Sequence, residues 1–480
     1  MRLSAKICAA ASVLWLAPTI HAQGTLPEAF TVRHARLDLE VDFAATRLSG
    51  VLTLDLENWT RTPANNISFV LNRLMDASQV RDAAGVAVPY TQDVLRFRDS
   101  PKRQVTQLVV RLPKAIRPGE RTTLRIDYAG YLAPYTEVGW LYVKDHIDTA
   151  FTIIRADAMA FPLVGGLSAE ANGHMPYPDF TYEAIVRVPS KFLVATGGVG
   201  TTTPNGDGTT TWRYASGQTS PFLNISIAPF DTISSRGVRV FFFPVDSTGA
   251  RRLMNSAQAA LRTLSEWFGP RPTEANLTIT EIPDGWGSQA HRVGGIIQTA
   301  SAFRDPSDVG ELYHEISHLW NPVDTDSPSP RWNEGLAMFL QGLLQENLDG
   351  WTGRAKVEAQ RIESLKRRLA SDSLVRVVPF IDYGARAMTG RSYTVGGVMF
   401  GALFELLGPA EFNKVVGGYS QHFALGGTTR DFIAFAKQTS SRDLTAFFDD
   451  WMFSTRWTQV VAGATSNGEV ASRYLPSPSR

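Results

Sequence analysis

The second half of this chain takes its fold from one stretch, Asp305-Pro-Ser-Asp-Val-Gly-Glu-Leu-Tyr-His-Glu-Ile-Ser-His-Leu-Trp320. Asp305 suits a helix cap, Pro306 suits the first helical position, and Pro322 lies just past the far end. Apolar side chains recur three and four residues apart, at Val309, Leu312, Tyr313, Ile316, Leu319 and Trp320. This spacing predicts an amphipathic helix that packs one face against a core.

The opposite side of this helix carries His314 and His318, which are one turn apart. Two imidazoles with that spacing can both reach one zinc ion at ~2.0–2.1 Å. Glu315 projects to the flank, where it can take a proton from water without being a ligand. The plainer alternative is a pair of histidines on the solvent side of a helix. The complete His-Glu-x-x-His pattern favours two metal ligands with Glu315 as catalytic base.

A zinc site with two histidines needs a third protein ligand, which comes from another element. Trp332-Asn-Glu-Gly-Leu-Ala337 offers Glu334 at the start of a second helical stretch, after the turn Ser327–Pro330. An antiparallel return of this second helix across the first would bring Glu334 beside the two histidines. The alternative is a glutamate that is stabilised only by the helix dipole. We predict Glu334 as the third ligand of one Zn²⁺ per chain.

Over the rest of the chain, the spacing of hydrophobic residues distinguishes two parts. Between Phe30 and Val245 it has the two-residue period of half-buried strands, as in Leu37–Phe43, and after Arg251 it has helical spacing. A chain of 480 residues exceeds the ~250–300 residues that one core supports. We therefore predict an α+β protein with a β-rich domain at 23–245, a mostly helical domain at 246–460 and a loose, Gly-, Ser-, Pro- and Ala-rich tail at 461–480.

The first residues read as a targeting segment. Arg2 and Lys6 precede the apolar run Ile7–Ile20, and the small residue Ala22 follows at a plausible cleavage point. An uncleaved anchor is the alternative, but the run is shorter than the ~20 residues of a spanning helix. We expect residues 1–22 to be a signal peptide, the protein to be periplasmic or secreted, and no stable membrane span after cleavage.

Composition excludes some classes of partner and site. The formal net charge is +1, so the chain has no basic field for a phosphate backbone, and nucleic acid is not an expected partner. The single cysteine, Cys8, lies in the targeting segment. The exported chain would then have no disulfide and no cysteine-based metal site.

These residues resemble the gluzincin metallopeptidases of the aminopeptidase N family, which join His-Glu-x-x-His to a downstream Asn-Glu-Gly. Weaker likeness extends over Phe30–Glu57, Tyr177–Pro189 and Asp443–Thr455. The resemblance implies an antiparallel β-sandwich-like domain followed by a thermolysin-like zinc catalytic domain. It also implies a zinc metallopeptidase that hydrolyses peptides or polypeptides, in a short form without the family's carboxy-terminal helical domain.

The resemblance implies a further catalytic residue, Tyr393. The segment Arg391-Ser-Tyr-Thr-Val-Gly-Gly397 is similar to the family's Tyr-x-Lys-Gly, with Val395 in place of the lysine. A phenol there would donate a hydrogen bond to the oxyanion that forms during hydrolysis. Tyr383 is the rival candidate for this role.

One departure from the family bears on specificity. Its aminopeptidases carry Gly-x-Met-Glu-Asn, whose Glu holds the substrate's α-ammonium, but Arg292 stands at that position here. A guanidinium suits a carboxylate or a polarised carbonyl. Gly294 and Gly295 would let an edge strand approach an extended peptide. These three residues are the predicted substrate contacts, and Glu281 or Asp284 would restore the exopeptidase reading if either faced the metal.

Three function classes follow from this pattern. The favoured class is a zinc peptidase, either an exopeptidase or an endopeptidase. The second is a zinc hydrolase that acts on a non-peptide substrate. The third is a binding protein that retains the fold and is catalytically silent, which fits poorly with the presence of both Glu315 and Tyr393.

Overall fold

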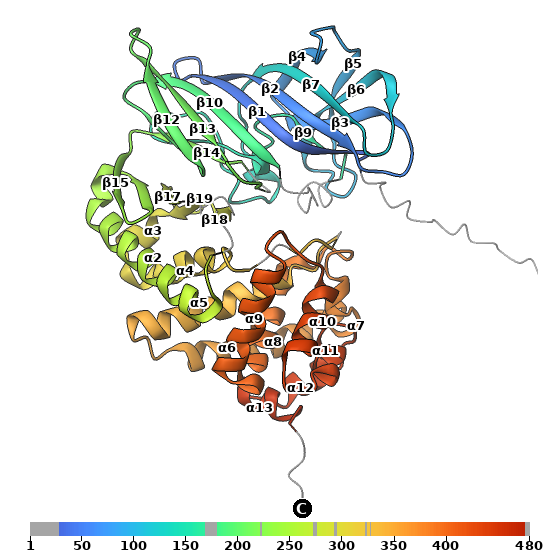
Figure 1. Ribbon diagram of the computed structural model, residues 1–480, viewed down its shortest axis with the longest axis vertical. Coiled ribbons are helices and arrows are strands. Elements are labelled where there is room, and N and C mark those ends of the chain that lie inside the picture. Colours follow the sequence, from blue (N-terminus) through green and yellow to red (C-terminus); the bar gives the residue numbers. More distant parts are fainter. Residues whose placement is uncertain are drawn as a thin grey trace, which may run out of the picture.

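The computed structural model places a strand-rich part against a helical part (Figure 1). It describes residues 28–168, 180–220, 223–271, 276–291, 295–321, 324–326 and 328–475. The expected signal peptide, residues 1–22, lies outside the described residues. Across the described ranges, no helix is both long enough and apolar enough to span a membrane.

Within the described residues, the first part is built from three sheets. The largest has the order β12-β13-β10-β1-β2-β7-β4, the second β5-β6-β3-β9 and the third β11-β14-β8. Their bounds are β1 (Phe30–Asp42), β2 (Arg47–Asn58), β3 (Ala64–Asn72), β4 (Met75–Asp82), β5 (Tyr90–Arg96), β6 (Gln104–Ile116), β7 (Arg121–Gly130), β8 (Thr152–Ile154), β9 (Leu163–Val164), β10 (Thr181–Pro189), β11 (Leu193–Ala195), β12 (Val199–Pro204), β13 (Thr209–Ala215) and β14 (Ile225–Ala228).

The predicted alternation explains how these sheets make a core. In β1, Leu37, Leu39 and Val41 are buried while Asp38 and Glu40 are not, so one face of the strand packs inward. The fold class is confirmed, with one departure from a purely antiparallel arrangement. β1 pairs with β10 in parallel, from His34 opposite Thr181 to Glu40 opposite Arg187. Because a long connection separates these strands, no hairpin dictates their relative direction.

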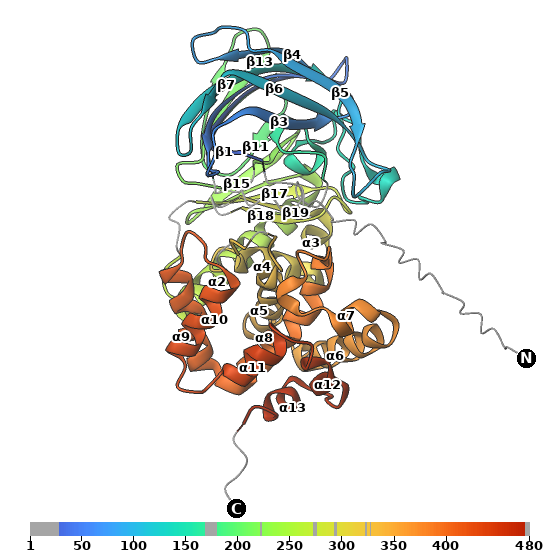
Figure 2. The same ribbon diagram turned by 90° about the vertical axis from the view of Figure 1, so that its right-hand side faces the viewer.

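A five-stranded sheet opens the second part. Its order is β15-β16-β17-β19-β18, with bounds β15 (Asp231–Ser235), β16 (Val238–Phe242), β17 (Leu277–Ile282), β18 (Gln289–His291) and β19 (Gly295–Thr299). β16, β17 and β19 run parallel, and the long helix α2 (Ser247–Phe268) makes the crossover from β16 to β17. Figure 2 shows this sheet between the other strands and the helices.

This sheet starts before the domain boundary predicted at 245/246. β15 and β16 precede that boundary, yet Val238, Val240 and Phe242 share one core cluster with α2. The second part therefore begins near Asp231. The sequence could not reveal this, because strands of both parts have the same two-residue period.

The remaining helices form the rest of the second part. Their bounds are α3 (Ala300–Arg304), α4 (Val309–Ser317), α5 (Trp332–Asp349), α6 (Arg354–Ser371), α7 (Ser373–Val377), α8 (Ser392–Leu407), α9 (Pro409–His422), α10 (Thr429–Thr439), α11 (Thr445–Trp451), α12 (Trp457–Ala462) and α13 (Asn467–Ser472). Helical spacing in the sequence predicts helices over Arg251–Phe268, Ser307–Trp320, Leu336–Leu348, Gly353–Ala370, Gly396–Leu407 and Leu444–Phe453, and these ranges correspond to α2, α4, α5, α6, α8 and α11.

The stretch expected as a loose tail, 461–480, is ordered as far as the structure describes it. α13 packs on α8, with Val470 and Ala471 buried. Asn467 donates a hydrogen bond from Nδ2 to Glu358 Oε2 over 2.9 Å. The abundance of small residues suggested a linker, but Asn467, Val470 and Ala471 are buried in this contact. Residues 476–480 lie outside the described part of the chain.

The two parts are joined by an apolar cluster and a buried ion pair. Phe151 of the first part contacts Trp286 of the second, with ring centroids 5.1 Å apart. Arg155 is fully buried and binds both carboxylate oxygens of Asp145, at 2.9 and 2.7 Å. It also donates to the backbone oxygens of Trp286 and Tyr142, at 3.0 and 2.9 Å. One guanidinium thus links both parts of the chain.

Candidate metal centre

α4 presents the two histidines as the sequence predicted. Asp305 caps the short 3-10 turn Pro306–Asp308 by accepting a hydrogen bond from the Ser307 amide over 2.8 Å. The predicted apolar stripe of this helix is buried. α4 ends at Ser317, earlier than expected, but His318 keeps helical angles (φ −62°, ψ −17°). His318 therefore still lies one turn beyond His314.

Three potential ligand atoms converge at one point. The distances are 3.3 Å from His314 Nε2 to His318 Nε2, 3.3 Å from His314 Nε2 to Glu334 Oε2, and 3.4 Å from His318 Nε2 to Glu334 Oε2. Around a tetrahedral zinc with ligands at ~2.0–2.1 Å, neighbouring ligand atoms lie about 3.3–3.4 Å apart. The spacing and the His, His, Glu donor set therefore fit a zinc ion, and the triad can bind a metal.

A close crossing of α5 and α8 fixes Glu334 in this position. A Cβ atom at Gly335 would lie 2.4 Å from the Cα of Gly396, so the two backbones touch at a pair of glycines. Ser392, at the start of α8, donates a hydrogen bond to the backbone oxygen of Pro330 over 2.6 Å. This crossing brings the first turn of α5, with Glu334, next to the first turn of α8, with Tyr393.

The electrostatics of Glu334 favour an ionised ligand. Its side chain is buried, and burial by itself would raise the pKa. Arg331 and His318 outweigh that effect and hold the pKa of Glu334 well below its ordinary value. Arg331 Nη2 forms an ion pair with Glu334 Oε1, while Oε2 faces the histidines. A buried carboxylate is thus ready to coordinate a cation.

Glu315 lies in the same helix as the histidines and is only 7 % exposed. Burial raises its pKa to about 8; His314 acts in the opposite direction, and Glu334 adds to the rise. A carboxyl whose pKa is raised toward the working pH is suited to accept and return a proton. The positive charge of a bound cation would lower this pKa and favour the carboxylate.

Tyr393, and not Tyr383, lies beside the triad. The Tyr393 ring is parallel to that of His314, with centroids 6.2 Å apart and planes inclined by 11°. Burial, and then the nearby Glu334 carboxylate, raise the pKa of Tyr393 above its ordinary value, so the hydroxyl keeps its proton. Tyr383 is fully buried against Phe380, and its hydroxyl has no hydrogen-bond partner among the described residues.

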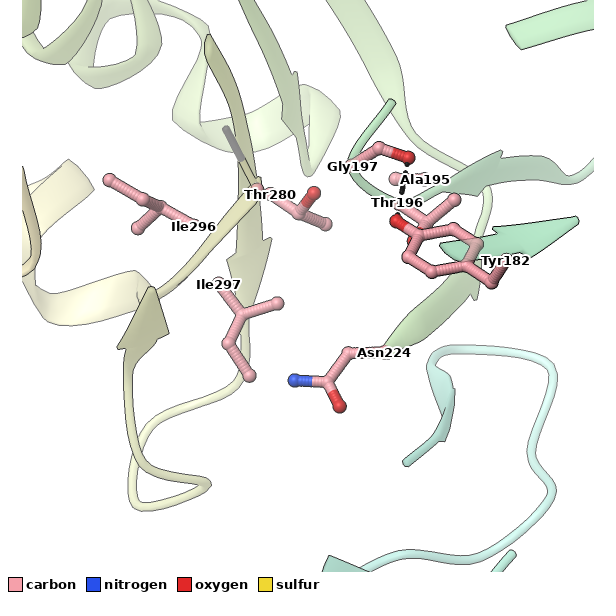
Figure 3. A pocket seen from close by; sticks show the side chains of 9 residues that line it. Tyr182, Ala195, Thr196, Gly197, Asn224, Thr280, Ile296 and Ile297 are labelled. Atoms are coloured by element: carbon pink, nitrogen blue, oxygen red, sulfur yellow. Dashed lines mark hydrogen bonds between the residues drawn. The ribbon is translucent and has the colours of Figure 1, made fainter. Parts of the chain in front are cut away.

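The predicted substrate contacts are only partly described. Arg292 and Gly294 lie outside the described residues. Gly295 begins β19 and lines a small cavity between the two parts, together with Tyr182, Thr196 and Asn224 from the first part (Figure 3). Gly295 therefore lies at the junction of the two parts, and its contact with substrate stays a prediction.

Neither carboxylate suggested for holding a substrate amine is free to do so. Glu281 is fully buried, accepts a hydrogen bond from the Phe243 amide over 2.8 Å, and has a pKa raised to about 9 by burial and by Asp246. Asp284 accepts hydrogen bonds from the Ser301 amide (2.7 Å) and from Arg304 (3.4 Å). Both side chains are engaged with groups other than the triad.

Sequence reasoning missed Arg331, which contacts both Glu334 and Tyr393. Its guanidinium carbon lies 5.9 Å from the centroid of the Tyr393 ring, in addition to the ion pair with Glu334. The sequence contained a signal for the contact with Glu334, because a residue three positions before a helical Glu lies on the same face of the helix. The backbone conformation that directs this side chain inward could not be read from the sequence.

Comparison with known proteins shows which solved structures share this fold. No protein-family model matches the sequence, and no curated protein matches it either. Solved structures do match. A variant of the M1 zinc metallopeptidase from Deinococcus radiodurans, bound to a Tyr-Ser-Ala substrate, has a TM-score of 0.65 at 20 % identity, over 88 % of this chain and 94 % of that one.

A two-domain M1 zinc metallopeptidase variant bound to L-arginine has a TM-score of 0.62 at 19 % identity, over 94 % of this chain and 96 % of that one. Another, bound to L-tryptophan, has a TM-score of 0.64 at 20 % identity, over 88 % and 94 %. The structural neighbours of this chain are thus M1 zinc metallopeptidases, and it shares their fold of a mixed-sheet domain followed by a helical domain.

Proposed function

We propose that this protein is a zinc-dependent metallopeptidase that hydrolyses peptide bonds. The observation that carries the proposal is the convergence of His314, His318 and Glu334, with ligand atoms 3.3–3.4 Å apart. Two residues suited to hydrolysis, Glu315 and Tyr393, lie beside that point. The fold shared with M1 zinc metallopeptidases, one of them bound to a tripeptide substrate, supports the same reaction class.

Each residue has a distinct task in the proposed reaction. The chemistry supplied by a zinc ion bound at the triad is activation of a water near neutral pH and polarisation of the substrate carbonyl. Glu315 accepts a proton from the attacking water and delivers it to the departing amine nitrogen. Tyr393 donates a hydrogen bond to the carbonyl oxygen as negative charge develops on it.

Three residues bear on which end of a peptide the protein would recognise. The amine-binding Glu of aminopeptidases is replaced by Arg292, and Glu281 and Asp284 are engaged elsewhere. An endopeptidase, or a hydrolase of peptides whose amino terminus is blocked, therefore fits these residues better than a strict aminopeptidase does. We also propose that the protein is exported, on the strength of the targeting segment at residues 1–22.

Metal analysis combined with product analysis tests the proposal. The purified protein is expected to contain about one zinc per chain, to lose peptide cleavage on treatment with a chelator, and to regain it on addition of zinc. Mass spectrometry of products distinguishes internal cuts from release of single amino-terminal residues. A zinc-free protein, or a zinc-loaded one that cleaves no member of a broad peptide library, would contradict the assignment.

Replacing Tyr393 with Phe is expected to lower kcat about 10²-fold with little change in KM, because the lost hydrogen bond forms mainly in the transition state. Steady-state kinetics on one peptide measure both constants. Tyr383→Phe is the matched control, since it removes a hydroxyl that is buried in the core. Equal losses in both variants would rule out a special role for Tyr393.

A further inference from the structure

Arg331 has an unusual backbone conformation directly before α5. Its φ of +57° and ψ of +42° lie in the left-handed region, which costs a residue with a Cβ atom and is readily adopted by Gly. Its side chain is 37 % exposed and its guanidinium is paired with Glu334. An unfavourable conformation is thus retained at the residue that touches a potential metal ligand.

The turn that carries Arg331 is held by hydrogen bonds. The Arg331 amide donates to Ser329 Oγ over 2.9 Å, and Ser329 Oγ donates to Asp324 Oδ2 over 2.8 Å. Thr429, at the start of α10, donates to the same oxygen of Asp324 over 3.2 Å. These bonds anchor the turn to a second helix and fix the direction in which the Arg331 side chain leaves the backbone.

We propose that Arg331 is a positioning residue that orients the carboxylate of Glu334 for the metal, an inference that rests on the proposed zinc site. The guanidinium holds Oε1, which leaves Oε2 directed at the histidines. Residues that hydrogen-bond a metal ligand in this way fix its orientation, and their loss typically weakens metal binding ~10–100-fold. A planar guanidinium restrains a carboxylate more firmly than an ammonium does.

If Arg331 had a purely structural role, Arg331→Gly would leave the Kd for zinc of the folded protein unchanged. The substitution relieves the positive φ but leaves the buried Glu334 carboxylate without its guanidinium, so the metal-free variant should be less stable than the wild type. Zinc affinity is therefore compared at a temperature at which each metal-free protein is fully folded, so that a difference in stability does not enter the Kd. Arg331→Lys keeps the positive charge but loses the planar fork, so it should recover part of the affinity.

The test is zinc affinity, measured by competition with a chromogenic chelator, alongside thermal unfolding of the metal-free proteins. Arg331→Gly is expected to raise the Kd for zinc ~10–100-fold at a temperature at which the metal-free variant is still fully folded. Arg331→Lys should give an intermediate Kd. The matched control is Arg354→Met, which also leaves a buried carboxylate, Glu358, without its guanidinium and breaks an ion pair with Glu346, about 18 Å further along α5; it should leave the Kd unchanged.

An unchanged Kd in Arg331→Gly would overturn the inference, and so would a Lys variant no better than the Gly variant. A rise in Kd that is absent at a temperature at which both metal-free proteins are fully folded would do the same. A wild-type protein that binds no zinc would instead contradict the zinc site itself, so the two failures are distinguishable.

Discussion

Glu315→Gln is expected to lower kcat by about 10²–10⁴-fold while the zinc content stays near one per chain. The substitution keeps the shape of the side chain but removes its ability to accept a proton. Glu315 is not one of the three converging groups, so its amide should leave metal binding intact. Steady-state kinetics and metal analysis of the same preparation measure both quantities.

A matched control for that variant is Glu281→Gln. Glu281 is also a buried carboxyl with a raised pKa, but it accepts a hydrogen bond from the Phe243 amide and is not one of the three converging groups. Because its raised pKa favours the neutral form, a neutral amide is a modest change there. The control should keep near wild-type turnover. Loss of zinc in Glu315→Gln, or turnover close to wild type, would mean that the roles are assigned incorrectly.

Arg155→Met should produce the largest loss of stability, about 3–5 kcal/mol. It leaves the Asp145 carboxylate fully buried without its cation. It also removes hydrogen bonds to the backbone oxygens of Trp286 and Tyr142, which join the two parts of the chain. Urea unfolding, followed by tryptophan fluorescence and by circular dichroism, measures the change in each transition.

Two further variants isolate the buried charge as the cause. Adding Asp145→Leu to Arg155→Met removes the stranded carboxylate and should recover part of the lost stability. Arg36→Met breaks exposed ion pairs with Asp38 and Glu183 and should cost no more than about 1 kcal/mol. If Arg155→Met were as mild as Arg36→Met, the two parts would not depend on the Arg155 guanidinium.

Much of the helical part was readable from the sequence because its signals are local. Caps, prolines and apolar spacing located α4, and the four-residue separation of His314 and His318 placed both imidazoles on one side of it. The expected return of α5 beside α4 followed from the need for a third ligand. Local patterns of this kind are determined by neighbouring residues in one element, so a single sequence contains them.

Contacts between distant segments were not readable in the same way. The alternation of β15 and β16 matches that of the first part, so only strand pairing assigned them to the second. The resemblance favoured Tyr393 over its rival Tyr383, but only the backbone contact between Gly335 and Gly396 explains why Tyr393 lies beside the triad. The small residues after 461 pack as a helix because α8 provides a surface for them.

The sequence by itself determined the ligand types, their spacing on one helix and the presence of a carboxylate base, since these depend on residue identity and helical period. Only the tertiary structure decided that Glu334 meets the histidines at the separations of a tetrahedral site, and that Arg331 holds its other oxygen. Those features depend on helix crossings and on a positive backbone φ, which arise from packing between remote segments and not from any local pattern.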